Sequence, residues 1–314
     1  MLKIHRFVQG RDEEVWVGVR NAAFKEYEDD RQIAADEFRI SERAPDFDVE
    51  GRFIAELDGK PVGIIHAHVD KKRKEKKGFV RSFGVVPEFR GKGVEEKLAE
   101  ISLEELKKRG MEVVQGWAVD RRGDRIRLWE SLGFKLVRKF SLMKRSLDKI
   151  SSGIGENKEV MLKPLQIDLD DDLKVLTQLG NECFEEHFNF RPSTFEEMVY
   201  WLREDPWFKE QVWFFAVLGG EHVGYVGLGI DEKYNIEKNV KCGWIMDVGV
   251  LKPNRIRGIG TRLMLQGMET LKAKGMAMAM LGVDDSNVTK AMKLYEKCGF
   301  KVAKKDFTYE RNLE

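Results

Sequence analysis

Cysteine is scarce in this chain of 314 residues, which contains three: Cys183, Cys242 and Cys298. They are few and widely spaced, so the sequence indicates neither a disulfide framework nor a cysteine-rich metal cluster. We therefore expect a protein of a reducing cytoplasm, with no metal site.

Long apolar runs and an excess of charge are also missing. No run of about 18 apolar residues occurs, so we expect no membrane span. The segment 1–6 lacks the apolar core of a signal peptide. Lys and Arg number 55 and Asp and Glu 54, for a net charge of +1. This balance predicts neither a nucleic-acid nor a membrane partner.

The length favours two domains, and 42% hydrophobic residues suffice for ordinary cores. An internal repeat with a period of roughly 165 residues supports this division. Arg90–Gly93 corresponds to Arg255–Gly258, and Leu128–Phe134 corresponds to Leu294–Phe300. We therefore predict two copies of one domain, over residues 1–149 and 159–314, joined by a linker at 150–158.

Hydrophobic periodicity predicts the elements of each copy. The pattern indicates an α/β fold with a mixed sheet (α+β), which opens with a strand and two helices and continues with a hairpin. A strand, a long helix, a further strand, a short helix and closing strands follow. In the first copy, strands are expected over 2–8, 53–57, 62–69, 79–86 and 112–118, and helices over 13–27, 36–42, 93–109 and 124–132.

One stretch of the second copy indicates a phosphate-binding turn. An apolar strand over 245–250 crosses a short turn at Pro253 and enters an amphipathic helix. The junction reads R-x-x-G-x-G, completed by Arg255, Gly258 and Gly260. Glycine lets a ligand approach the backbone, and a helix N-terminus offers unpaired N–H groups to a pyrophosphate.

The spacing of that turn distinguishes three kinds of phosphate loop. A dinucleotide-binding fingerprint and a P-loop are both absent. With the strand Val248–Val250, the stretch resembles the acetyl-CoA loop of the GCN5-related N-acetyltransferases. The segment Ala291–Phe300 resembles the later motif of that family, A-x-x-L-Y-E-K-x-G-F. The resemblance implies two tandem GNAT (acyl-CoA N-acyltransferase) domains. It also implies acetyl-CoA as cofactor, bound in the second copy by Val248, Gly249, Val250, Arg255, Arg257, Gly258, Ile259, Gly260, Thr261 and Asn287.

The reaction that the resemblance implies is direct transfer of an acetyl group to an amine, on a small molecule or a peptide. Tyr295 is the expected general acid for the departing thiolate. A backbone N–H of the strand at 248–250 is placed to polarise the thioester carbonyl. Asn287 is expected to cap or precede the helix at Tyr295 and to touch the pantetheine arm, with capping alone as the alternative explanation.

The general base is less clearly marked. Asp247 is the candidate on the central strand, although strict alternation with Val248 directs its side chain away from the acceptor. The family often has Glu slightly earlier, where this chain has Trp244. Glu186 and His187 lie near the expected acceptor pocket, and a water relay without a dedicated base is a further alternative.

The first copy departs from both family motifs. Glu95 stands at the position of Gly260, and Trp129 at that of Tyr295. A carboxylate repels a pyrophosphate, and an indole N–H is too weak an acid to replace a phenol. We expect this copy to be a structural partner, with residual CoA binding through its Arg90–Gly93 loop left open.

The acceptor side, over residues 181–208, resembles the C-terminal half of mycothiol synthase-like tandem acetyltransferases. A partly apolar acceptor wall is expected there. The alternative function is a non-catalytic acetyl-CoA sensor or scaffold, and a monomer or homodimer is expected in either case. The aromatic candidates for the wall are Phe188, Phe190, Tyr200, Trp201, Trp207 and Phe208.

Overall fold

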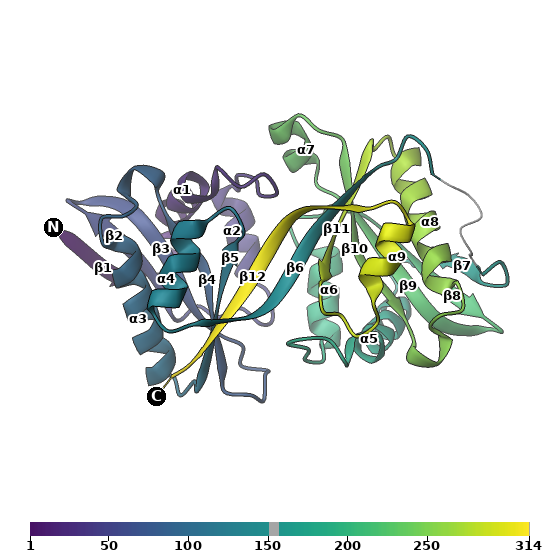
Figure 1. Ribbon diagram of the computed structural model, residues 1–314, viewed down its shortest axis with the longest axis horizontal. Helices are drawn as coiled ribbons and strands as arrows, with labels where there is room; N and C mark the ends of the chain where they lie inside the picture. The colour runs from purple at the N-terminus through teal and green to yellow at the C-terminus, as the bar shows by residue number, and fades with distance from the viewer. Residues whose placement is uncertain (151–156, 314) are drawn as a thin grey trace. The chain divides into compact units, whose positions relative to one another are not determined.

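The computed structural model describes residues 1–150 and 157–313 (Figure 1). Most of the predicted linker, residues 151–156, lies outside the described residues. The chain divides into two compact units, each described here by itself. Unit 1 consists of Met1–Arg138 and Asp306–Glu314, and unit 2 consists of Lys139–Lys305.

Unit 1 contains most of the elements of the first copy, close to their predicted bounds. Its strands and helices are β1 (Leu2–Arg6), α1 (Glu13–Phe24), α2 (Ala35–Ser41), β2 (Arg52–Leu57), β3 (Lys60–Val69), β4 (Lys77–Val85), α3 (Val94–Lys108), β5 (Val113–Val119) and α4 (Gly123–Ser131), followed by the start of β6 (Lys135–Ser146).

Unit 2 repeats this order with one additional helix, α7. Its elements are β7 (Met161–Pro164), α5 (Asp170–Phe184), α6 (Phe195–Arg203), β8 (Glu210–Leu218), β9 (Glu221–Ile230), α7 (Glu232–Lys238), β10 (Cys242–Val250), α8 (Ile259–Ala273), β11 (Met278–Asp284) and α9 (Ala291–Lys297), followed by the start of β12 (Lys301–Asn312).

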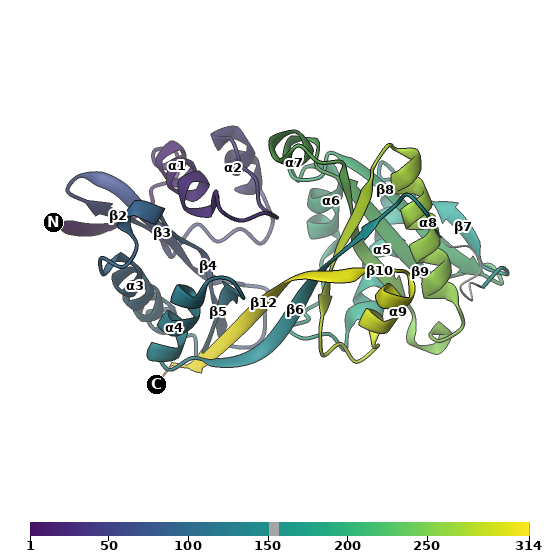
Figure 2. The same ribbon diagram turned by 45° about the horizontal axis from the view of Figure 1, so that its top comes forward.

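Each unit is a mixed sheet with helices on both faces (Figures 1 and 2). The strand order is β1-β2-β3-β4-β5-β12 in unit 1 and β7-β8-β9-β10-β11-β6 in unit 2. One core of unit 2 packs α8 and α9 against the sheet, and another packs α5 and α6. The same two layers occur in unit 1, formed by α3 and α4 and by α1 and α2.

The closing strands are exchanged between the two repeats. Residues Phe140–Ser146 of β6 pair with β11, in unit 2. Residues Asp306–Asn312 of β12 pair with β5, in unit 1. The compact units therefore differ from the predicted domains 1–149 and 159–314, in which each copy keeps its own last strand.

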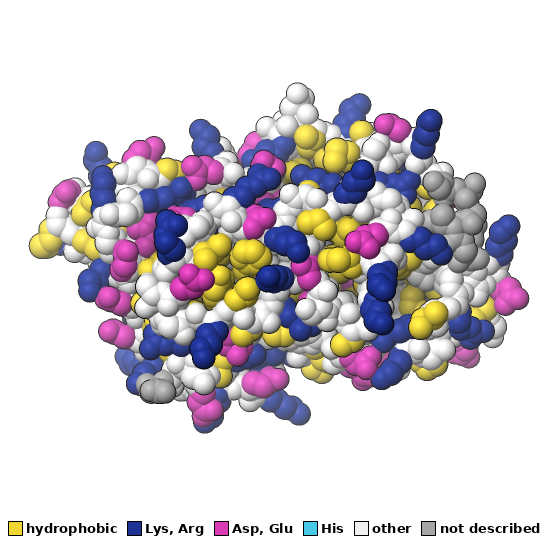
Figure 3. All heavy atoms as spheres, viewed as in Figure 1, with side chains coloured by type: hydrophobic (Ala, Val, Ile, Leu, Met, Phe, Trp, Pro, Cys, Tyr) yellow, Lys and Arg dark blue, Asp and Glu magenta, His cyan; other side chains and the backbone are white. Residues whose placement is uncertain are grey.

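Helix α7 was not predicted from the sequence. Its start is fixed by Asp231, whose side chain accepts a hydrogen bond from the backbone N–H of Tyr234, and it ends at Asn239 in the left-handed region. None of the described helices is long and apolar enough to cross a membrane. On the face shown in Figure 3, cationic and anionic side chains are interspersed, in keeping with their near-equal numbers.

Candidate active site

The cofactor cleft of unit 2 begins where two parallel strands separate. β10 pairs with β11 over Cys242–Trp244, opposite Met278–Met280, and no further. On its other edge β10 stays paired with β9, and the N–H of Leu251 points to β9. N–H groups alternate along a strand, so those of Val248 and Val250 point to the open edge. This edge can hold an extended ligand.

The N-terminus of α8 lies at the end of this cleft. Gly258 is its N-cap, with φ of 77° in the left-handed region that glycine tolerates. Ile259 and Thr261 bury their side chains, so they offer a ligand their backbone N–H groups. A Cβ at Gly260 would meet Leu294 at 3.0 Å, so glycine lets the start of α8 and the side chain of Leu294 lie close together. The arrangement suits a pyrophosphate.

The two predicted arginines of the loop differ in their surroundings. Arg255 donates from Nε to the carbonyl of Val250 and from Nη2 to that of Cys183, and it pairs with Glu186 at 2.9 Å. These bonds join the end of α5 to the loop. Arg257 is exposed and can reach an anionic ligand.

Ile256 adopts an unusual backbone conformation between these arginines. Its φ is 62°, and its side chain is fully exposed. A β-branched residue is strained in the left-handed region. Such strain is concentrated at ligand-binding loops in proteins.

Asn287 does not cap α9, whose N-cap is Lys290. The side-chain oxygen of Asn287 accepts from the N–H and the hydroxyl of Thr289, both at 2.7 Å. The capping interpretation is therefore wrong, and Asn287 shapes the loop ahead of the helix.

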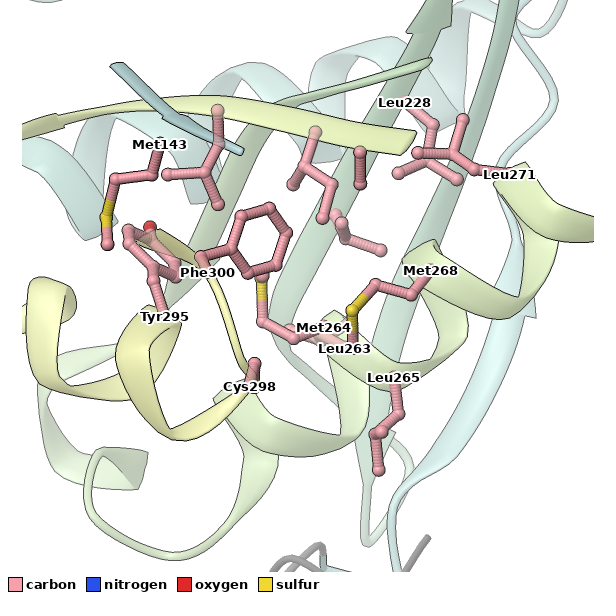
Figure 4. Close-up of a cluster of buried hydrophobic side chains, with 14 of the residues drawn as sticks. Met143, Leu228, Leu263, Met264, Leu265, Met268, Leu271, Tyr295, Cys298 and Phe300 are labelled. Carbon is pink, nitrogen blue, oxygen red and sulfur yellow. The ribbon is translucent and has the colours of Figure 1, made fainter. Parts of the chain in front are cut away.

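Tyr295 lies in the core under the cleft and points toward Met143 and Phe300 (Figure 4). It is 7% exposed. Its hydroxyl has no hydrogen-bond partner among the described residues. Burial raises the pKa of Tyr295, and the nearby charge of Asp247 raises it further. The phenol therefore keeps its proton at neutral pH, as a general acid requires.

The acceptor side of unit 2 holds a pocket of about 440 Å³. Asp247 and its neighbour Met246 both line it. Two successive residues reach one face because the register of β10 against β9 shifts between Ile245 and Asp247. Such a bulge redirects a side chain. The alternation argument, which turned Asp247 away from the acceptor, is therefore wrong.

The carboxylate of Asp247 is half-buried and hydrogen-bonded. Tyr225 donates to it at 2.7 Å. Burial raises the pKa of Asp247 to about 6, although bonds from Tyr225 and the N–H of Val248 favour the charged form. Gly249 leaves room for this contact, because a Cβ there would meet the Tyr225 ring at 2.7 Å. Tyr225 was not predicted; it lies opposite Gly249 in the pairing of β9 with β10.

The other candidate bases are placed differently. Glu186 lies at the surface and pairs with Lys252 and Arg255, whose hydrogen bonds lower its pKa. The ring of His187 packs on Phe184. Trp244 packs against Phe208. Of the predicted aromatic wall, the residues that line the pocket are Phe190, Trp201, Trp207 and Phe208.

Unit 1 fills the corresponding cleft with side chains. Glu95 and Arg125 are both buried, and the Arg125 guanidinium lies 3.4 Å from the ring centre of Phe83. Trp129 is fully buried and donates from Nε1 to the carbonyl of Trp117. At the corresponding positions unit 2 has smaller residues, Gly260, Ala291 and Tyr295.

A possible metal-ligand group lies in unit 1, formed by Asp48, His66 and His68 with ligand atoms within 4.8 Å of one another. Arg109 donates two bonds of 2.9 Å to Asp48. Burial lowers the pKa of His66 to about 4, so it is neutral. The guanidinium supplies the counter-charge that a metal ion would bring.

Comparison with known proteins places this site in a family. The sequence profile of the Acetyltransferase (GNAT) family matches residues 16–134 and 176–300. The chain belongs to this family. A tandem GNAT protein from the clavulanic acid biosynthesis pathway has the same fold, with a TM-score of 0.78 and 13% identity over 100% of this chain and 99% of the other. A GCN5-related N-acetyltransferase from Sphaerobacter thermophilus gives a TM-score of 0.71 and 22% identity over 100% and 96%.

Curated relatives match over a shorter span. A mycothiol acetyltransferase from Thermomonospora curvata is 34% identical over 131 residues, 42% of this chain and 43% of the relative. That of Thermobispora bispora is 31% identical over 137 residues, 42% and 46%. The matches thus span less than half of the length of these relatives. They agree with the resemblance to tandem acetyltransferases.

Proposed function

We propose that unit 2 transfers an acetyl group from acetyl-CoA to an amine, and that unit 1 does not. The observation that carries this proposal is the position of Asp247. It is half-buried and lines the pocket, and it belongs to β10, the strand whose unpaired edge opens the cleft toward β11. The cofactor would supply an activated acetyl thioester, held by the edge at Val248–Val250 and by the amides at the start of α8.

Asp247 acts first in this mechanism. With a pKa of about 6, its carboxylate is largely ionised at neutral pH and accepts a proton from the incoming ammonium. The mostly apolar lining of the pocket favours this transfer because partial burial disfavours both charged forms. The amine nitrogen then forms a bond to the acetyl carbon, and the open-edge N–H groups of β10 stabilise the oxyanion. As the carbon–sulfur bond breaks, Tyr295 would give its proton to the sulfur. The acylated nitrogen would then lose its second proton, which restores the Tyr295 hydroxyl, and Asp247 would release its proton to the solvent.

A test of this proposal uses the full chain with labelled acetyl-CoA and a panel of amines. Asp247→Asn should lower kcat by ~10²–10⁴-fold while CoA affinity stays unchanged, because the amide cannot take a proton. Equal turnover of the variant and the wild type would contradict the role of Asp247. Cofactor binding without transfer to any amine would support the sensor or scaffold alternative.

The stability of the same variant provides a control. The folded pKa of Asp247 lies above the unfolded value of 3.8, so its ionisation costs stability as pH rises through about 6. Asparagine has no such cost. Above pH 6 the variant should therefore melt at an equal or higher temperature than the wild type, which separates loss of chemistry from loss of fold.

A further inference from the structure

The acceptor pocket of unit 2 has mostly apolar walls. Glycines at 227 and 229 let large rings lie against β9, because a Cβ at these positions would come within 2.4 Å of Trp213 and 2.7 Å of Phe208. Trp213 in turn stacks on Tyr225, with ring centres 6.1 Å apart. The apolar lining residues are Phe184, Phe190, Met198, Trp201, Leu202, Trp207, Phe208, Trp213, Tyr225 and Met246.

Polar side chains of the lining direct their hydrogen bonds to the protein. Asn181 donates to the carbonyl of Ser193 and accepts from its N–H. Gln211 donates to the carbonyl of Trp201 and accepts from Nε1 of Trp213. A ligand hydroxyl buried here would lose its bonds to water and gain little in return, which costs about 1–3 kcal/mol per group. The pocket therefore disfavours a polyhydroxylated acceptor.

Arg191 also lines the pocket, but its charge is compensated. Its guanidinium donates two bonds, of 2.6 and 2.8 Å, to Glu197, which is fully buried. Glu197 also accepts from the N–H of Thr194 and so closes the capping box of α6. A cation bound in this way is a poor partner for a ligand carboxylate.

Asp247 gives the pocket its charge. Its half-buried carboxylate is paired with a hydroxyl, that of Tyr225, and an anion without a cationic partner favours a cationic ligand. Aromatic faces nearby also attract an organic ammonium. A second carboxylate, Asp205, lines the pocket and accepts from the N–H of Trp207 at 2.8 Å.

We propose that the acceptor is a primary amine on an apolar, ring-containing body, without a carboxylate or several hydroxyls. This proposal rests on the proposed function, because it names the substrate of the same site. In this proposal the aromatic wall and the Arg191–Glu197 pair determine specificity. The reactive nitrogen of the acceptor lies next to Asp247.

The first test compares 2-phenylethylamine, phenylalanine and glucosamine as acceptors for the full chain. We expect kcat/KM for 2-phenylethylamine to be at least ~100-fold higher than for phenylalanine or glucosamine. This ratio corresponds to a difference of about 2.7 kcal/mol in activation free energy. Preference for either polar amine would overturn the proposal.

Binding is followed separately by tryptophan fluorescence, since Trp201, Trp207 and Trp213 line the pocket. Apolar amines that bind without being acetylated would refute the proposed function, and the measured binding preference would then show only which amines the pocket selects. Failure of 2-phenylethylamine to bind better than glucosamine would refute this one.

A second test alters the charge of the wall. Glu197→Gln leaves Arg191 uncompensated, so phenylalanine should improve relative to 2-phenylethylamine by roughly tenfold, about 1.4 kcal/mol. Glu37→Gln is the matched control, because Glu37 makes the same two bonds with Arg31 in unit 1. It should leave selectivity unchanged. A folded Glu197→Gln protein with wild-type selectivity would show that Arg191 does not face the acceptor, against the proposal.

Discussion

Glu95 and Trp129 of unit 1 stand where unit 2 has Gly260 and Tyr295, in otherwise similar surroundings. Even the arginine that anchors the loop is conserved in its bonds: Arg90 donates to the carbonyls of Val85 and Ala23, as Arg255 does in unit 2. The fold of the loop is therefore no indication of activity. The difference lies in whether side chains fill the space between the strands.

The acceptor sides differ in the same way. His66 faces Arg52 across the hairpin of unit 1, where Gly227 faces Trp213 in unit 2. Buried imidazoles and a guanidinium fill the first, whereas glycine leaves room for a pocket in the second. The position of Asp247 is held by Ser82 in unit 1. Asp247, Gly260 and Tyr295 thus have counterparts in unit 1 that lack their chemistry, whereas the arginine that anchors the loop is kept.

After Asp247→Asn, the largest effect on turnover is expected at Tyr295. Tyr295→Phe should lower kcat by ~10²-fold, the lower end for general acid catalysis, because a thiolate is a fairly good leaving group and the raised pKa makes the phenol a weaker acid. CoA affinity should not change, since the ring still packs. Turnover, CoA binding and melting temperature are measured on one sample. Wild-type turnover would remove Tyr295 from the mechanism.

Next in size is the effect of making the cofactor loop of unit 2 resemble that of unit 1. Gly260→Glu should weaken CoA binding by about 1–3 kcal/mol, through repulsion and loss of space. Calorimetry on the full chain measures it, with Gly260→Ala as the control for size alone. The reverse change, Glu95→Gly, should not create a second site, because Arg125 and Trp129 still fill the cleft. Two bound CoA molecules per chain would contradict this.

A smaller change is expected in the pH dependence of kcat/KM when Tyr225 is replaced by Phe. Tyr225→Phe removes the hydrogen bond that favours ionised Asp247, so the pKa of Asp247 should rise above about 6. The acid limb of kcat/KM should move to higher pH by ~1 unit, with kcat at pH 8 little affected. An unchanged limb would assign the ionisation to another group.

The smallest effect is expected in the loop. Ile256→Gly should stabilise the protein by about 1 kcal/mol or less, because relief of the left-handed strain outweighs the added freedom of the unfolded chain. Thermal unfolding measures it. The matched change Gly91→Ala, at a φ of 68°, should destabilise unit 1. A lower melting temperature for Ile256→Gly would mean that Ile256 is not strained.

Much of this comparison could be predicted from the sequence. The repeat, the order of elements and the substitutions at Glu95 and Trp129 all follow from motif spacing. Local patterns could not place Asp247, because a single bulged residue reverses which face a strand presents. Nor could the charge of Arg255 indicate that it would bind backbone carbonyls of α5 and β10.

The strand exchange was equally hidden, for a different reason. β6 and β12 are similar in length and in their alternation of apolar and polar residues. Their sequence patterns therefore do not distinguish β5 from β11 as the partner strand. Sequence therefore predicts a closing strand for each copy without saying which copy supplies it. Separating the halves at 150–158 would deprive each unit of the strand that completes its sheet, which is why the variants above are made in the full chain.

The exchange also sets the timing of folding during translation. The ribosome releases residues 306–312 only after the other strands of unit 2, yet these residues pair with Val113–Val119. Unit 1, most of which is synthesised earlier, therefore leaves β5 with an unpaired edge until β12 has emerged. A stop codon just before β12 would damage the sheet of unit 1 and spare the pairing of β11 with β6 in unit 2.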